Sequence, residues 1–178
     1  MAKMTHHGKP QAAVSLREIT RATVWSICDL KTTPEQERFC GPNVDSLIEA
    51  LFEPRAWFRA IYADETPVGF LMLARDTNAG GPLEAPTGEH FLWRLMIAAE
   101  HQGQSYGRRA LQHLIAHVRT LPGATSILTS CGLGEGSPLA FYHGLGFVET
   151  GDMLEEEVVL RLPLTESIPY IEGQSPFG

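Results

Sequence analysis

One stretch of the chain restricts its fold more than any other. The strand-like run FLWRLMI (Phe91–Ile97) is followed at once by HQGQSYGRRALQHLI (His101–Ile115), in which a glycine-containing loop leads into an amphipathic helix. The first turn of a helix carries N–H groups without intrahelical partners, and the helix dipole favours negative charge there. The order strand, loop, helix therefore predicts an anion site, most often a phosphate site, with Arg108 and Arg109 near enough to add charge.

The two common phosphate motifs do not fit this loop. A P-loop would end in Gly-Lys-Ser/Thr, and the dinucleotide fingerprint would need three spaced glycines and an acidic residue at the end of the next strand. Neither pattern is present. From the loop alone, a second interpretation stays equally good: the glycines only shape a strand-to-helix turn.

The rest of the chain predicts a single domain with a mixed sheet. Apolar periodicity and turn residues predict strands, helices and strands again in the order β, α, α, β, β, β, α, β, α, β, β. Meandering strands followed by strand–helix–strand crossings give an α/β (α+β) fold with helices packed on the sheet. We expect a polar tail over residues 1–13, one domain over 14–164 and a tail over 165–178. In the helix expected over 43–51, apolar residues fall on one face at Val44, Leu47, Ile48 and Leu51.

Composition excludes several functional classes. With 178 residues, 43% of them hydrophobic and 20% charged, the chain is expected to be one soluble globular domain. A net charge of -7 argues against nucleic-acid binding. The sequence predicts no membrane span and no signal peptide. Three widely spaced cysteines fit neither a disulfide framework nor a metal site, so we expect a cytoplasmic protein without a metal.

Two motifs bear a specific resemblance to a known family. LMIAAEHQGQSYGRRALQHLI resembles the acetyl-CoA-binding motif of the GNAT superfamily of N-acetyltransferases, Gln/Arg-x-x-Gly-x-Gly/Ala, in which Gln102 and Gly107 match and Ser105 departs at the first glycine position. SPLAFYHGLGFVETG is similar to the family segment Asn-x-x-Ala-x-x-x-Tyr-x-x-x-Gly-Phe. Its matching positions are Ala140, Tyr142, Gly146 and Phe147, and Ser137 stands where the family often has Asn.

The resemblance covers roughly residues 14–164 and implies a fold and a co-substrate. The implied fold has a mostly antiparallel, splayed sheet of six or seven strands flanked by about four helices. The implied co-substrate is acetyl-CoA, bound by backbone groups of the central strand, by the loop and by the second motif. The positions that correspond are Leu95, Met96, Ile97, Gln102, Gly103, Gln104, Ser105, Tyr106, Gly107, Arg108 and Ser137.

The resemblance also implies a reaction, the direct transfer of an acetyl group to an amine. Tyr142 matches the family tyrosine proposed as the general acid, since a phenol stays protonated at neutral pH and can donate to the leaving sulfur; an aromatic core residue is the alternative. Glu89 and His90 are candidate bases at the start of the central strand, although both could be solvated strand-end residues. Cys131 could form an acetyl-enzyme, but a buried structural thiol is the better interpretation.

The acceptor is expected between the first two helices and Trp93. Acidic residues there, among them Asp45 and Glu49, would suit a small cationic amine such as a polyamine, and the N-terminal half looks like the spermine/spermidine branch of bacterial GNAT enzymes. An ordinary solvated helix face explains these acids equally well. The alternatives are a protein, peptide or aminoglycoside acceptor, or a non-catalytic acetyl-CoA-binding module, and relatives in the family are often homodimers.

Ser105 leaves two outcomes open. At negative φ a serine can cap the helix and cost nothing. At positive φ any residue other than glycine is strained by about 1 kcal/mol.

Overall fold

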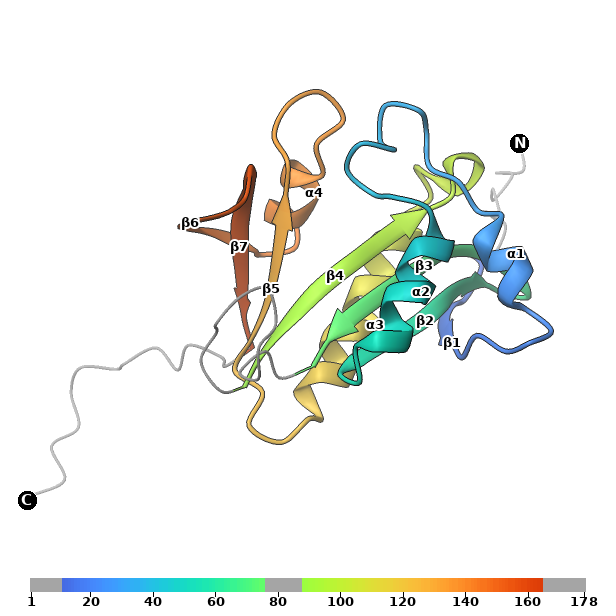
Figure 1. Cartoon of the computed structure of the whole chain (residues 1–178), viewed down its shortest axis with the longest axis horizontal. Coiled ribbons are helices and arrows are strands. Elements are labelled where there is room, and N and C mark those ends of the chain that lie inside the picture. The colour runs from blue at the N-terminus through green and yellow to red at the C-terminus, as the bar shows by residue number, and fades with distance from the viewer. Residues whose placement is uncertain (1–10, 76–87, 165–178) are drawn as a thin grey trace, which may run out of the picture.

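The computed structural model describes residues 11–75 and 88–164 (Figure 1). Seven strands form one sheet in the order β1-β2-β3-β4-β5-β7-β6. The strands are β1 Val14–Arg17, β2 Ala56–Ala63, β3 Thr66–Ala74, β4 Glu89–Ile97, β5 Ser126–Cys131, β6 Val148–Leu154 and β7 Glu157–Pro163. The helices are α1 Val24–Cys28, α2 Asn43–Phe52, α3 Tyr106–Arg119 and α4 Leu139–His143, with a 3-10 turn at Ala99–His101. The expected tails and a predicted loop lie largely outside the described residues.

The two faces of the sheet carry separate apolar cores. On one face α3 buries its stripe of Ala110, Leu111, Leu114 and Val118, as its periodicity predicts. On the other face α1 and α2 cover a cluster around Phe70 and Met72. In Figure 1, α2 lies in front of the sheet and α3 behind it. The mixed sheet expected from the sequence is observed.

Of the apolar stripe of α2, Leu47 packs against the cluster around Phe70 and Met72, whereas the other three residues are exposed. Val44, Ile48 and Leu51 are 38%, 52% and 78% exposed. The buried side of the helix instead carries Asn43 and Ser46. Asn43 can be buried on that side because its side-chain amide donates to the backbone oxygen of Ile27 (2.8 Å).

The sheet splays open in its middle. β4 and β5 are parallel and pair only over Glu89–Phe91 and Ser126–Leu128, after which they separate, while β4 stays paired with β3 and β5 with β7. The β3–β4 register skips one residue, Trp93, because Met72 pairs with Arg94 and Leu73 with Leu92. Such a bulge bends a strand and increases its twist. The bulge lies where β4 separates from β5. Beyond their three-residue ladder the two strands diverge, and the space between them is called the wedge below.

Candidate active site

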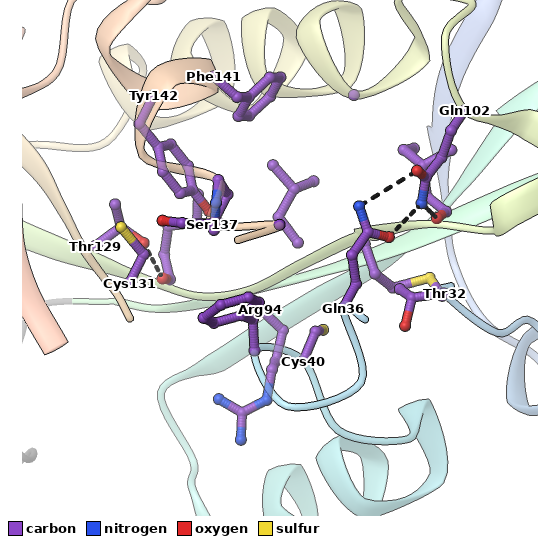
Figure 2. A pocket seen from close by; sticks show the side chains of 18 of the residues that line it. Thr32, Gln36, Cys40, Arg94, Gln102, Thr129, Cys131, Ser137, Phe141 and Tyr142 are labelled. Atoms are coloured by element: carbon purple, nitrogen blue, oxygen red, sulfur yellow. Dashed lines mark hydrogen bonds between the residues drawn. The ribbon is translucent and has the colours of Figure 1, made fainter. Parts of the chain in front are cut away.

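A cavity of about 500 Å³ occupies this wedge. Its walls come from the loop between α1 and α2, from β4 after Phe91, from the loop before α3, from the end of β5 and from α4. Figure 2 shows Tyr142, Thr129, Cys131 and Ser137 gathered at one end and Gln36 with Gln102 at the other. The cavity thus joins the two sequence motifs that lie about 30 residues apart.

The loop before α3 has the geometry of an anion site. The first backbone bond of α3 is donated by Arg109 to the oxygen of Ser105 (3.1 Å), so the N–H groups of the first turn precede that bond. Gly103 and Ser105 both have positive φ, at 75° and 62°. Alternating left- and right-handed residues turn successive N–H groups toward one point, as anion-binding nests do.

The conformation of Ser105 decides between the two outcomes left open by the sequence. The residue stands before the first turn of α3 at φ 62° and ψ 15°, in the left-handed region, and its side chain makes no capping hydrogen bond. The harmless cap is therefore wrong, and the strained alternative holds. The loop keeps its glycine-like path with a side chain that is unfavourable there.

We expect Ser105→Gly to stabilise the protein by about 0.5 to 1 kcal/mol, because it removes a Cβ from a left-handed position. The measurement is the free energy of unfolding from urea titration. Ser105→Ala is the matched control: it removes the hydroxyl but keeps the Cβ, and it should give no gain. Equal gains from both variants would show that the hydroxyl, not the backbone, is the unfavourable part.

Gln102 uses its side chain to hold the loop in place. Its amide nitrogen donates to the backbone oxygen of Ile97 (2.9 Å) and to Oε1 of Gln36 (2.7 Å), and Gln36 Nε2 approaches its Oε1 at 3.3 Å (Figure 2). Gln36 lies between α1 and α2, 66 residues away. This amide pair joins the loop before α3 to the opposite wall of the cavity. Gln36 could not be predicted from the sequence, since no local pattern marks a partner so distant.

We expect Gln36→Ala to weaken binding at the loop by about five-fold, because one or two net hydrogen bonds of about 1 kcal/mol each order it. Calorimetric titration with coenzyme A measures this directly. Gln36→Glu keeps an acceptor for Gln102 Nε2 and should lose less than Gln36→Ala. Wild-type affinity in Gln36→Ala would mean that the loop holds its shape without the pair.

Tyr142 projects from α4 into the cavity beside β5 (Figure 2). Its side chain is 6% exposed and packs edge-on against Phe141 and Phe147, with ring centroids 5.3 and 5.4 Å away. Burial raises the pKa of its phenol above the ordinary value, and a side-chain hydrogen bond with Thr129 opposes only part of that rise. The hydroxyl is therefore a protonated donor at neutral pH, held in a fixed direction.

The second motif is tied to β5 through Ser137. Its hydroxyl donates to the backbone oxygen of Gly132 (2.7 Å) and accepts from the N–H of Leu139 (3.3 Å). α4 starts at Leu139, one residue later than the sequence predicts, with Pro138 at the N-cap position. Ser137 lines the cavity and fixes the segment that carries Tyr142.

On the other side of the cavity, Arg108 donates to the oxygen of Gly144 (3.0 Å) and so links α3 to α4.

Backbone groups of β4 border the cavity. Leu95, Met96 and Ile97 line it, and they follow the last β4 residue that pairs with β5. Within the splay, Thr129 Oγ1 donates to the oxygen of Leu92 (3.0 Å), which connects the strands where their ladder has ended. The edge of β4 that faces β5 therefore has main-chain positions outside the sheet ladder.

Glu89 and His90 precede the part of β4 that borders the cavity, and neither lines it. They are 5% and 4% exposed. The Glu89 carboxylate accepts from Ser126 Oγ (2.8 Å) and pairs with Arg161 Nε (2.9 Å). These contacts give Glu89 a structural role in joining β4, β5 and β7.

The residues expected at the acceptor site are only partly brought together. Trp93 lines the cavity, whereas Asp45 and Glu49 do not. Glu49 lies 3.3 Å from an Arg94 guanidinium nitrogen, so its carboxylate forms an ion pair with an arginine of the cavity wall. Figure 2 shows the Arg94 side chain extending from β4 toward α2. Among the described lining residues there is no aspartate or glutamate, so the immediate wall is neutral or cationic.

Cys131 and Cys40 also line the cavity. Burial raises the pKa of both thiols, which disfavours the nucleophilic thiolate. Within residues 11–75 and 88–164, no group of three or more His, Cys, Asp or Glu side chains is placed to hold a metal ion. In the same segments, no helix is long and apolar enough to cross a membrane.

Comparison with known families identifies the class to which this fold and cavity belong. The acetyltransferase (GNAT) family matches residues 21–147, more than half of the chain. The chain belongs to this family, whose members are acyltransferases. A comparison with curated proteins gives no match.

Solved structures support the same fold. An acetyltransferase from Thermus thermophilus is 21% identical, with a TM-score of 0.66 over 86% of this chain and 98% of that one. The aminoglycoside acetyltransferase AAC(6')-Ib, solved with coenzyme A, is 15% identical, with a TM-score of 0.70 over 85% and 95%. Spermidine N-acetyltransferase from Vibrio cholerae, solved with coenzyme A and spermine, is 17% identical, with a TM-score of 0.62 over 85% and 95%. At these identities the likeness shows the fold alone.

Proposed function

We propose that this protein transfers the acetyl group of acetyl-CoA directly to a primary amine. The observation that carries the proposal is the protonated Tyr142 hydroxyl in the cavity between the splayed strands. A transferase of this kind must bind a phosphorylated thioester, admit an amine and protonate a leaving thiolate in one cleft. The wedge offers a donor-rich loop, exposed β4 backbone and a buried phenol for these tasks.

The residues of the chain fit acetyl-CoA by their chemistry. The first-turn N–H groups of α3, at Tyr106, Gly107 and Arg108, would hold the pyrophosphate. Main-chain groups of Leu95–Ile97 would hold the pantetheine arm and polarise the thioester carbonyl. Tyr142 would give its proton to the leaving sulfur. Solved neighbours in the family contain coenzyme A, which is consistent with this assignment.

For the acceptor we propose a small cationic amine of the polyamine type. Two structural neighbours support a polycationic acceptor, since one was solved with spermine and the aminoglycoside acetyltransferase AAC(6')-Ib with kanamycin. Asp45 and Glu49 of α2 lie outside the cavity wall, and Glu49 pairs with the wall residue Arg94. The β6–β7 hairpin, which joins β5 through β7, also carries acidic side chains outside the cavity wall: Glu149, Asp152, Glu155, Glu156 and Glu157.

The test is a thiol-release assay with acetyl-CoA against spermidine, kanamycin and a peptide with a free N-terminus and a lysine. Release with spermidine above the background hydrolysis rate is expected. Faster release with kanamycin or the peptide would support acetyl transfer but refute the polyamine as the acceptor. Tight binding of acetyl-CoA by calorimetry, with no release for any amine, would favour a non-catalytic binding module and overturn the proposal.

A further inference from the structure

Neighbouring hydroxyl residues of β5 face opposite sides of the sheet at the wedge. Thr129 interacts with Tyr142, on the face that packs against α3 and α4. Ser130 is the next residue, and side chains alternate along a strand. Its neighbour on the same side, Leu128, packs with Phe91 and Val159 in a cluster on the opposite face, which identifies the side that Ser130 occupies.

Ser130 has an acidic partner on that second face. Its hydroxyl donates to Glu157 Oε2 at 2.5 Å, and Glu157 is the first residue of β7. Ser130 lines the cavity, whereas Glu157 does not. Glu157 is half-buried, so it can exchange a proton with solvent. A hydrogen-bonded path therefore runs from the cavity through one hydroxyl to a carboxylate at the molecular surface.

We propose that Ser130 and Glu157 form a proton relay that deprotonates the acceptor amine. The inference rests on the proposed acetyl transfer. The groups that take the proton from the amine would lie on one face of β5, and Tyr142, which donates a proton to the sulfur, would lie on the other. Ser130 would touch the amine, while Glu157 acts through it as a positioning and proton-accepting residue.

The proton balance of the reaction closes with these groups. A bound ammonium nitrogen gives one proton to Ser130 Oγ as the Ser130 proton passes to Glu157 Oε2. The neutral nitrogen forms the C–N bond, the C–S bond breaks, and Tyr142 protonates the departing sulfur. The acylated nitrogen loses its second proton, which restores the Tyr142 phenol, and Glu157 returns the first proton to solvent.

The groups that face this relay are few among the described residues. From β5 and α4, Cys131 and Tyr142 interact electrostatically with Glu157. From β6, Glu149 acts on Cys131. On β7, Arg161 lies on the same side of the strand as Glu157, and its guanidinium pairs with Glu89.

The experiment is a pH–rate profile of acetyl transfer for wild type, Glu157→Gln and Ser130→Ala, using the best amine of the thiol-release panel. At pH 7 each variant should lose about 100-fold in kcat/KM, the lower range for a general base. Above pH 9.5 the defect should shrink to within about three-fold, because solution then supplies the neutral amine. The double variant should be no slower than either single one, and Ser130→Thr should restore most of the activity.

Matched controls distinguish failure of the relay from failure of the proposed function. Glu18→Gln removes an exposed acid that pairs with Arg59 and lies outside the cavity, and it should match wild type. Coenzyme A affinity should be unchanged in every variant. The relay would be refuted if the Glu157→Gln defect persisted at high pH, or if there were no defect at pH 7. Wild-type turnover in the same assay would still support the proposed function. Absence of turnover in wild type itself would instead refute the proposed function.

Discussion

Tyr142→Phe is expected to lower turnover by about 100-fold while leaving acetyl-CoA affinity within two-fold. The variant removes only the hydroxyl oxygen, so the edge-on contacts with Phe141 and Phe147 persist. Without a proton donor, the sulfur must leave as a free thiolate, and general acid catalysis of this kind contributes 10²- to 10⁴-fold. Steady-state kinetics and calorimetric titration with acetyl-CoA measure the two effects separately.

Tyr62→Phe is the matched control for this variant. Tyr62 is likewise buried, at 8% exposure, but it lies on β2 under the Arg17 guanidinium and outside the cavity. Loss of its hydroxyl should leave turnover unchanged. Equal turnover in Tyr142→Phe and wild type would remove Tyr142 from the chemistry and leave it as a core aromatic residue.

Gly88→Ala is expected to lower the free energy of unfolding by about 3 kcal/mol. Gly88 has a φ of 91°, and a Cβ built there would lie 2.1 Å from the backbone oxygen of Gly123. Left-handed strain costs about 1 kcal/mol and forced overpacking 1 to 3 kcal/mol more. The residue also accepts a backbone bond from Thr125 (2.9 Å), so a shift would disturb the start of the β4–β5 ladder. Urea titration measures the loss.

Gly151→Ala isolates the two contributions. Gly151 also has positive φ, at 88°, but no atom lies within 4 Å of the position of a Cβ. Its substitution should cost only the conformational strain, about 1 kcal/mol. Equal losses at the two glycines would mean that Gly123 moves aside without cost and that the ladder tolerates the shift.

Short-range sequence patterns were sufficient to predict α3 and the loop before it. The stripe of α3 and the loop that precedes it follow from spacing within about 15 residues. Apolar spacing was not sufficient for the orientation of α2, because Val44, Ile48 and Leu51 are exposed while the polar Asn43, bonded to Ile27, is buried. The capping interpretation of Ser105 was wrong because the backbone path of the loop, not the residue type, determines φ at that position.

The parts of the site that the sequence could not predict depend on distant contacts. Gln36 meets Gln102 across 66 residues, and Ser130 meets Glu157 across 27. Neither pair has a spacing that local periodicity would select. The bulge at Trp93 is likewise invisible in the sequence, because it is defined by the register against β3. Tyr142 was predicted as a site residue from the resemblance of its motif, and the structure adds its burial and its neighbours.

The three-residue ladder between β4 and β5 makes the sheet two sub-assemblies that share a narrow joint. A molecule that fills the wedge would brace both sides at once, so its binding energy would count as folding energy for the whole domain. Occupancy at 100 times the dissociation constant would add about 2.7 kcal/mol. The resistance of this chain to unfolding would then rise and fall with the concentration of that ligand.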